Sequence, residues 1–85
     1  MYSAEFDEKW VGHFEAISPA IKERIAKKLR QILDGLLGRH LGRGSPFFVE
    51  EIGQYGICYA SDEKRKARRF YFVGDHKEYE RWLGL

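Results

Sequence analysis

Two candidate strands and the turn between them lie in one stretch of the sequence, QYGICYASDEKRKARRFYFVGD, at residues 54–75. Large apolar side chains alternate with small ones over residues 55–60, which is the two-residue period of a strand with one buried face. Residues 61–64 predict a turn, and residues 68–73 predict the second strand of an antiparallel hairpin that ends at Gly74. Because an isolated hairpin is only marginally stable in water, the rest of the chain must supply a covering layer.

That layer is predicted at residues 19–36, where one helix face is apolar and the other is basic. Ser18 is a favourable N-cap and Pro19 fits the first helical position, so the helix is expected to begin there. Steps of three and four residues define the apolar face, which consists of Ile21, Ile25, Leu29, Ile32, Leu33 and Leu36. The glycine-rich residues 35–44 are expected to end the helix and form a loop.

Shorter elements complete the expected fold. A strand at residues 2–6 precedes a first helix that Asp7 caps, and another strand follows at residues 47–52. Asp75, with Glu78 three residues later, predicts a capping box at the start of a short C-terminal helix. The prediction is a two-layer α+β fold: an N-terminal strand, two helices, a three-stranded antiparallel meander joined to the first strand in one sheet, and the short C-terminal helix.

The composition excludes several classes of protein. Hydrophobic residues make up 44% of the 85 residues and aromatic residues 15%, which is too much for an intrinsically disordered chain. No apolar run approaches the roughly 20 residues that a membrane-spanning helix needs, so no membrane association is expected. Cys58 is the single cysteine, and a chain without an internal disulfide fits the reducing cytoplasm. We therefore expect residues 1–85 to fold as one cytoplasmic domain.

Positive charge is concentrated in two segments, although the formal net charge is only +2. Residues 22–43 hold seven lysines and arginines and residues 64–69 hold five, together 12 of the 15 in the chain. Clustered positive charge is typical of a protein that binds a polyanion, because neutralised phosphates release their counterions. The alternative is a solvated helix face together with a charged hairpin tip.

No metal, nucleoside-triphosphate or reactive-thiol site is predicted, and no cofactor is expected. The three histidines do not fall at a helical metal-binding spacing, and Cys58 lies mid-strand without a histidine near it in sequence. The glycine-rich loop lacks the Gly-Lys-Ser/Thr ending of a P-loop and follows a helix rather than a strand. It is interpreted either as a flexible basic crossing or as a segment that holds Arg39, His40 and Arg43 near a phosphate.

The segment GDHKEY, residues 74–79, brings the imidazole of His76, the ammonium of Lys77 and the phenol of Tyr79 together in sequence. RNA cleavage needs a group that accepts the 2′-OH proton, cations on the phosphate and a group that protonates the leaving oxygen. Imidazole groups titrate near neutral pH and phenol rings stack on bases, so these residue types suit the reaction. The alternative is a capped amphipathic helix in which Tyr79 is a packing anchor.

The order of elements, together with QYGICY at residues 54–59 and FYFVGDHKEY at residues 70–79, resembles the RelE/ParE superfamily of toxins from toxin–antitoxin pairs. The resemblance covers nearly the whole chain. For RelE-like members it implies a metal-independent ribonuclease that cuts mRNA in the ribosomal A site and is silenced by an antitoxin wrapped around it. ParE-like members instead poison DNA gyrase and lack the ribonuclease chemistry.

The resemblance also implies site residues and two departures from the family pattern. His76 or Lys77 matches the basic catalytic residue after the last strand, and Tyr79 matches the tyrosine that stacks on or orients the nucleotide. Gly56 stands where the family carries a phosphate-clamping arginine on the central strand. Residues 49–51, Val-Glu-Glu, stand where active relatives carry lysines, and one of the two glutamates is a candidate base.

A strand register could compensate for the missing arginine. If the hairpin turn consists of the two residues 62–63, Gly56 lies opposite Arg69, and cross-strand partners project to the same face of a sheet. Arg69 is then expected to supply the cation that is absent at Gly56.

Two functions are expected as alternatives. The first is a RelE-like, ribosome-dependent mRNA endoribonuclease that acts by acid–base chemistry, with His76, Lys77, Tyr79 and Arg69 as catalytic residues. The residues expected to bind RNA are Lys22, Lys27, Lys28, Arg30, Arg39, Arg43, Lys64, Arg65, Lys66 and Arg68. The second is a non-enzymatic member of the same fold, either a ParE-like gyrase inhibitor or a degenerate toxin that serves as a partner-binding module. The expected partners are a cognate antitoxin, the ribosome with its mRNA, and a second copy in a homodimer.

Overall fold

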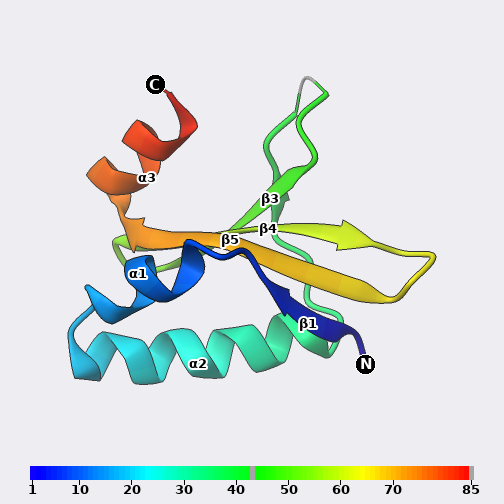
Figure 1. Cartoon of the computed structure of the whole chain (residues 1–85), viewed down its shortest axis with the longest axis horizontal. Coiled ribbons are helices and arrows are strands. Elements are labelled where there is room, and N and C mark those ends of the chain that lie inside the picture. Colours follow the sequence, from blue (N-terminus) through cyan, green and yellow to red (C-terminus); the bar gives the residue numbers. More distant parts are fainter. Residues whose placement is uncertain (43, 85) are drawn as a thin grey trace.

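The computed structural model describes residues 1–42 and 44–84, so Arg43 and Leu85 lie outside the described residues. The elements follow one another along the chain as β1 (Ser3–Phe6), α1 (Trp10–Glu15), α2 (Pro19–Leu33), β2 (Arg39–His40), β3 (Phe47–Ile52), β4 (Tyr55–Asp62), β5 (Ala67–Asp75) and α3 (His76–Leu83) (Figure 1). The strands form one sheet in the order β1-β5-β4-β3-β2. β1 is parallel to β5, whereas the other neighbours are antiparallel. The predicted α+β fold is confirmed, and β2 is an addition that the sequence analysis assigned to the loop.

The long helix α2 covers one face of the sheet as expected (Figure 1). Ser18 is its N-cap in extended conformation and Pro19 is the first helical residue. Ile25 and Ile32 are fully buried, and each contributes about 1.5–3 kcal/mol of hydrophobic stabilisation. Leu36 lies beyond the helix end and is 39% exposed, so the apolar face is one position shorter than predicted.

The first helix begins later than the sequence analysis predicted. Lys9, not Asp7, is the N-cap of α1, and Trp10 is the first helical residue. The Asp7 carboxylate instead accepts a hydrogen bond from the Lys9 backbone N–H at 3.1 Å, which closes a turn before the helix. Trp10 is buried, and its ring lies 5.8 Å from that of Phe70 on β5, so α1 packs over the β5 side of the sheet.

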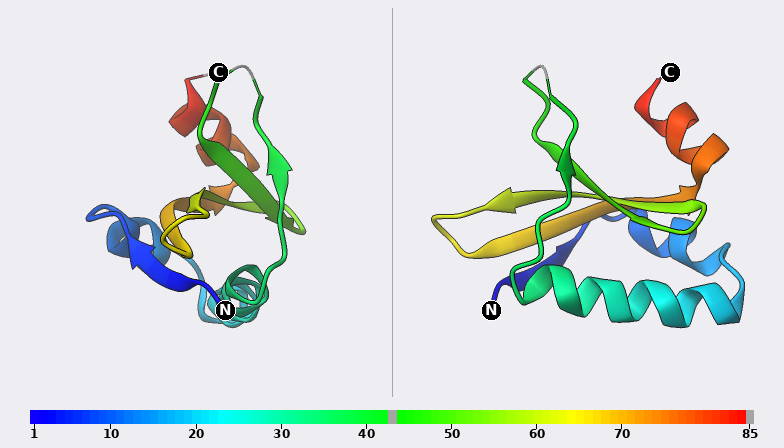
Figure 2. Two further views of the ribbon diagram at one scale, coloured as in Figure 1. Left: turned by 90° about the vertical axis from the view of Figure 1, so that its right-hand side faces the viewer. Right: turned by 180° about the vertical axis from the view of Figure 1, so that it is seen from behind.

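Apolar side chains cover both faces of the sheet. The main core lies on the α1–α2 face and consists of Trp10, Ile17, Ile25, Ile32, Ile52, Ile57, Tyr59, Phe70 and Val73. A second, smaller cluster lies on the other face and consists of Val49, Cys58, Phe72 and Tyr79, with Leu41, Trp82 and Leu83 packed against it. Figures 1 and 2 show that α3 and the β2–β3 arm both rise from this second face, away from α2. None of the helices within the described residues combines the length and apolar character needed to cross a bilayer.

The β4–β5 hairpin has a different register from the one that a two-residue turn would give. Asp62 pairs with Ala67, so the turn contains the four residues 63–66, and Lys66 adopts a left-handed φ of 52°. A bulge between Cys58 and Tyr59 shifts the pairing again. Gly56 consequently lies opposite Gly74, and β5 continues through Gly74 to Asp75 rather than ending there.

Candidate functional site

Tyr79 lies directly on the sheet, over Gly56 of β4. A Cβ atom added at Gly56 would lie 3.7 Å from Cδ1 of Tyr79, so the phenol ring covers this backbone position. The capping box predicted from sequence holds α3 in place: the Glu78 N–H donates to the Asp75 carboxylate at 2.9 Å, and the Asp75 N–H donates to the Glu78 carboxylate at 3.0 Å. Tyr79 is only 8% exposed. The packing role that was left open for Tyr79 is therefore present in the structure.

His76 and Lys77 occupy the exposed first turn of α3. The His76 and Tyr79 rings are 5.6 Å apart between centroids and tilted by 41°. The imidazole and the phenol expected at the site are thus neighbours, and the imidazole remains accessible to solvent.

Arg39 on β2 is brought to the same place. Its cross-strand partner is Val49, so Arg39 projects to the face of the sheet that carries Glu51 two residues further along β3. The Arg39 guanidinium donates to the Glu51 carboxylate at 3.2 Å. This hydrogen bond, followed by a weaker interaction with the phenol of Tyr79, raises the pKa of Arg39. The cation beside Tyr79 therefore comes from β2.

The two residues of β2 are held firmly against the rest of the molecule. Gly38 approaches β3 so closely that a Cβ atom there would lie 2.3 Å from the carbonyl oxygen of Val49, which no side chain allows. The Gly38 N–H donates to the phenol oxygen of Tyr59 at 2.8 Å. After the strand, the Leu41 N–H donates to the carbonyl of Phe47 at 3.0 Å. These contacts fix the backbone on both sides of Arg39.

An open pocket of about 590 Å³ lies between the β2–β3 arm and α3. Its lining residues are Arg39, Leu41, Gly42, Ser45, Phe47, Tyr79, Trp82 and Leu83. The Phe47 and Trp82 rings meet edge to face at 5.2 Å, so the walls are aromatic and one cation stands among them. Aromatic faces with a guanidinium are the groups that nucleic-acid-binding proteins use for bases and phosphates. The arrangement suits a nucleotide.

The two candidate glutamates lie on opposite faces of β3. Glu50 faces α2, where its carboxylate is 3.8 Å from the ammonium of Lys28. Glu51 pairs with Gly56 across the β3–β4 ladder and lies on the Tyr79 face with its side chain 59% exposed. Glu51 is the glutamate placed to act at this site.

Arg69 does not supply the cation for Gly56, and the register behind that prediction is wrong. Arg69 pairs with Ala60, which lies four residues along β4 from Gly56, roughly 13 Å away at strand spacing. Its guanidinium contacts the carboxylates of Glu5 at 4.0 Å and Asp7 at 3.7 Å. The bulge and the four-residue turn explain the error, because each moves the pairing from the position that a two-residue turn would give.

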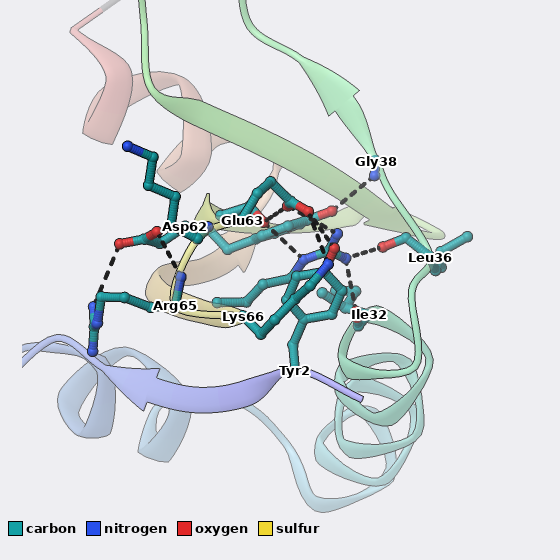
Figure 3. Close-up of polar contacts among 12 residues, drawn as sticks. Tyr2, Ile32, Leu36, Gly38, Asp62, Glu63, Arg65 and Lys66 are labelled. Carbon is teal, nitrogen blue, oxygen red and sulfur yellow. Dashed lines mark hydrogen bonds and ion pairs between the residues drawn. The ribbon is translucent and has the colours of Figure 1, made fainter.

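Arg68 was expected to bind RNA, but the structure buries it. Its guanidinium donates to the carbonyl oxygens of Ile32 at 2.7 Å and Leu36 at 2.6 Å, at the C-terminal end of α2. It also stacks on Tyr2, with 3.9 Å from the guanidinium carbon to the ring centroid, and lies 3.8 Å from Glu63 (Figure 3). At 2% exposure it is not accessible to a phosphate, and its role is to tie β5 to the C-terminal end of α2 through these two carbonyl groups.

The other expected RNA-binding residues form two groups. Lys64, Arg65 and Lys66 are exposed at the tip of the β4–β5 hairpin, where Arg65 pairs with Glu5 and Lys66 lies 3.9 Å from Glu63. Apart from Arg39 on β2, the remaining described ones are on α2, where Lys22 pairs with Glu15 at 3.2 Å and Arg30 is exposed. Arg43 lies outside the described residues.

A basic groove of about 370 Å³ lies between α2 and the end of β3. Arg24, Lys27 and Lys28 line it together with Glu51, the partner of Arg39. Lys27 and Lys28 are among the residues predicted to bind RNA, whereas Arg24 is not. Arg24 precedes them by three and four residues, and this spacing puts all three on adjoining positions of the helix surface.

Cys58 is fully buried, and desolvation raises the pKa of its thiol to about 12. A thiol in this state is a packing group rather than a nucleophile. Among the described residues, no three His, Cys, Asp or Glu side chains come together in a way that could hold a metal ion.

Known proteins resemble this chain in structure but not in sequence. The sequence matches no protein-family model and no curated protein. The structure is similar to that of the isolated RelE toxin of E. coli, with a TM-score of 0.78 and 16% identity over 99% of this chain and 97% of that chain.

Toxin–antitoxin complexes give further matches. One is RelBE2 of Mycobacterium tuberculosis, with a TM-score of 0.76 and 18% identity over 87% of this chain and 90% of that chain. Another is the RelE–RelB complex of Pyrococcus horikoshii, with a TM-score of 0.69 and 17% identity over 88% and 94%. The molecule therefore belongs to a class of small α+β folds in which a C-terminal helix follows the last strand of a mixed sheet. More specifically, it has the fold of the RelE toxins, as the sequence resemblance predicted.

Proposed function

We propose that this protein is a RelE-like toxin that cleaves mRNA on the ribosome. The observation that carries the proposal is the convergence of Tyr79, His76 and Glu51 beside an aromatic pocket in a RelE fold. The pocket is wide enough for a nucleotide, and its groups are those that acid–base cleavage of RNA requires.

In the proposed reaction, Glu51 accepts the proton of the ribose 2′-OH, and the 2′-oxygen attacks the neighbouring phosphorus. The bond from phosphorus to the 5′-oxygen then breaks, and protonated His76 gives its proton to that leaving oxygen. The products are a 2′,3′-cyclic phosphate and a free 5′-hydroxyl. Tyr79 orients the reacting nucleotide by donating a hydrogen bond from its hydroxyl to the phosphate, and Lys77 adds positive charge there.

The basic residues give the proposed path of the RNA. The groove lined by Arg24, Lys27 and Lys28 also contains Glu51, whose carboxylate pairs with Arg39 of the pocket. The proposed path places the phosphate backbone along these three cations and then at Arg39. The exposed hairpin tip with Lys64, Arg65 and Lys66 provides a second contact with ribosomal RNA.

The proposed protein partner is an antitoxin, because several of the similar structures are toxin–antitoxin complexes. An antitoxin segment, or a second copy of this chain, would use apolar surface on the α3 side of the sheet. Phe47 is on that side, where its ring meets Tyr71 at 5.2 Å. Phe48 is not available, because it stacks on Tyr59 in the main core.

In-vitro translation with ribosomes, mRNA and the purified protein tests the proposed activity. We expect the wild-type protein to cut the message, and His76→Ala and Tyr79→Phe to cut it at least about 100-fold more slowly. Tyr79→Phe keeps the ring on Gly56, so it separates the chemistry of the phenol from its packing. Uncut mRNA with the wild-type protein, or unchanged cleavage by both variants, would reject the proposal.

A second function is favoured by the residues on the strands. Gly56, Val49 and Glu51 are not cations, and Glu51 neutralises the nearby Arg39. A ParE-like gyrase inhibitor or a degenerate toxin that only binds a partner would not need those cations. In this case growth inhibition by the wild-type protein persists in His76→Ala and Tyr79→Phe. If the protein is a nuclease, both variants are expected to lose it.

A further inference from the structure

We propose that Arg39, delivered by the two-residue strand β2, is the phosphate-binding residue of this site, and that Glu51 holds it in place until RNA binds. The inference rests on the proposed function and names the ligand of the pocket as a single-stranded RNA phosphate with its base. It assigns the missing cation to a strand that lies outside the β3–β5 meander.

Arg39 is the cation on the lining of the aromatic pocket as far as the described residues show. It stands among Phe47, Tyr79 and Trp82, whose rings offer stacking surfaces for a base. A guanidinium binds phosphate through two parallel hydrogen bonds, and this geometry suits a single residue that must fix both position and orientation. A stacked base and a clamped phosphate are the two contacts that define one nucleotide.

The position of Arg39 is built into the fold rather than left to a mobile loop. Gly38 permits the close approach to Val49, the Tyr59 phenol accepts the Gly38 N–H, and the ladder to β3 continues through the Leu41 N–H. The side chain itself remains 61% exposed, so only the backbone of Arg39 is fixed. A fixed backbone with an accessible guanidinium is the arrangement that a binding residue needs.

The ion pair with Glu51 gives the site two states. Both side chains are about 60% exposed, so water screens the pair and a phosphate can replace the carboxylate at low cost. Once Arg39 moves to the phosphate, the Glu51 carboxylate leaves the ion pair and is free to accept the hydrogen of the 2′-OH. Phosphate binding and release of Glu51 are therefore the same event.

Two other arginines near the sheet do not fit this role. Arg69 pairs with Glu5 and Asp7 at another part of the sheet, and Arg68 is buried at the end of α2. Gly56 has no side chain, and the Tyr79 ring covers it. Arg39 therefore supplies the cation that β4 lacks at Gly56.

The test uses the full chain and a short single-stranded oligoribonucleotide whose 2′-oxygens are methylated, so that it binds without being cleaved. Binding is followed by the fluorescence of Trp82 in the pocket wall, whereas Trp10 is buried in the other core. We expect Arg39→Gln to weaken binding about 10-fold or more, and Arg39→Lys to restore part of the loss. Arg81→Gln on α3 removes the same charge outside the pocket lining and is expected to stay within about twofold of wild type.

Glu51→Gln sharpens the test because binding and cleavage should move in opposite directions. Removing the carboxylate frees Arg39, so the oligonucleotide is expected to bind about 2- to 5-fold more tightly, while cleavage of mRNA falls. Equal binding by Arg39→Gln and Arg81→Gln, or no binding by the wild-type protein, would overturn the inference. Arg39-dependent binding without mRNA cleavage would instead refute the nuclease and leave the phosphate site standing.

Discussion

Arg68 and Arg39 lie on opposite faces of the same sheet, and each has a carboxylate partner near the surface. The Arg68 side chain is 3% exposed and donates to two carbonyl groups and the hydroxyl of Ser61. The Arg39 side chain is 61% exposed and donates a hydrogen bond to Glu51. The same chemical group therefore serves the fold on the α2 face and is accessible to a ligand on the α3 face.

The difference shows how burial and the number of fixed acceptors decide the role of a cation. Replacing Arg68 would remove its hydrogen bonds to the carbonyl groups of Ile32 and Leu36 and weaken the link between β5 and the end of α2, so Arg68 is part of the structure. Arg39 can change partner with little cost because its ion pair is exposed to water. Sequence position alone does not separate these cases, since both residues lie in basic segments.

The largest effect is expected when the buried arginine is removed. Arg68→Met keeps much of the side-chain volume but removes the hydrogen bonds to the carbonyl groups of Ile32 and Leu36, so the free energy of unfolding should fall by about 3 kcal/mol. Urea denaturation followed by circular dichroism measures the change. Arg65→Met on the same hairpin is the matched control, and its exposed side chain should leave the midpoint nearly unchanged. Equal midpoints for the two variants would contradict the structural role of Arg68.

A smaller effect links the main core to the Arg39 site. Tyr59→Phe removes the phenol oxygen that accepts the Gly38 N–H, so we expect a loss of about 1 kcal/mol in stability and a several-fold weaker binding of the methylated oligonucleotide. Both the loss of stability and the weaker binding are expected because β2 is then held less firmly against the main core. Tyr55→Phe, on the same strand, is the control. If Tyr59→Phe loses stability but binds RNA as the wild-type protein does, β2 does not position Arg39.

The smallest effect concerns the outer partner of Arg68. Hydrogen bonds from the Ser61 hydroxyl and then the Tyr2 phenol lower the pKa of Glu63 below its ordinary 4.5. A lowered folded-state pKa contributes stability above pH 4.5 and loses it as the pH falls through the folded value. The difference between the free energies of unfolding at pH 7 and at pH 3 should therefore be slightly smaller for Glu63→Gln than for the wild-type protein. An unchanged pH dependence would show that Glu63 contributes nothing to the Arg68 network.

The amphipathic and alternating segments were predictable because burial imposes their periods. The α2 face, the strands β3–β5 and the capping box of Asp75 and Glu78 all follow from such patterns. β2 was not predictable in this way, because a strand of two residues is too short to show a period. Gly38 was the available signal, since a glycine is required where two backbones approach this closely.

The register of the β4–β5 hairpin could not be predicted either. Tyr55, Ile57 and Tyr59 alternate in the same way whether the turn has two residues or four, so the pattern fixes the faces but not the partners. Arg69 was thus assigned to the correct face and the wrong position along it. Arg68 lies toward α2, where the end of the helix provides the acceptors that make a buried arginine stable.

The parallel pairing of β1 with β5 has a consequence for the order of folding. Ser3 pairs with Ala67, and the Ser3 N–H donates to the carbonyl of Lys66, so β1 finds its partners only after the last strand has been made. Contacts this distant in sequence form slowly, because the chain must close a long loop before they stabilise it. During synthesis β1 therefore stays unpaired, and the sheet is completed only after enough of the chain has left the ribosome for β5 to fold.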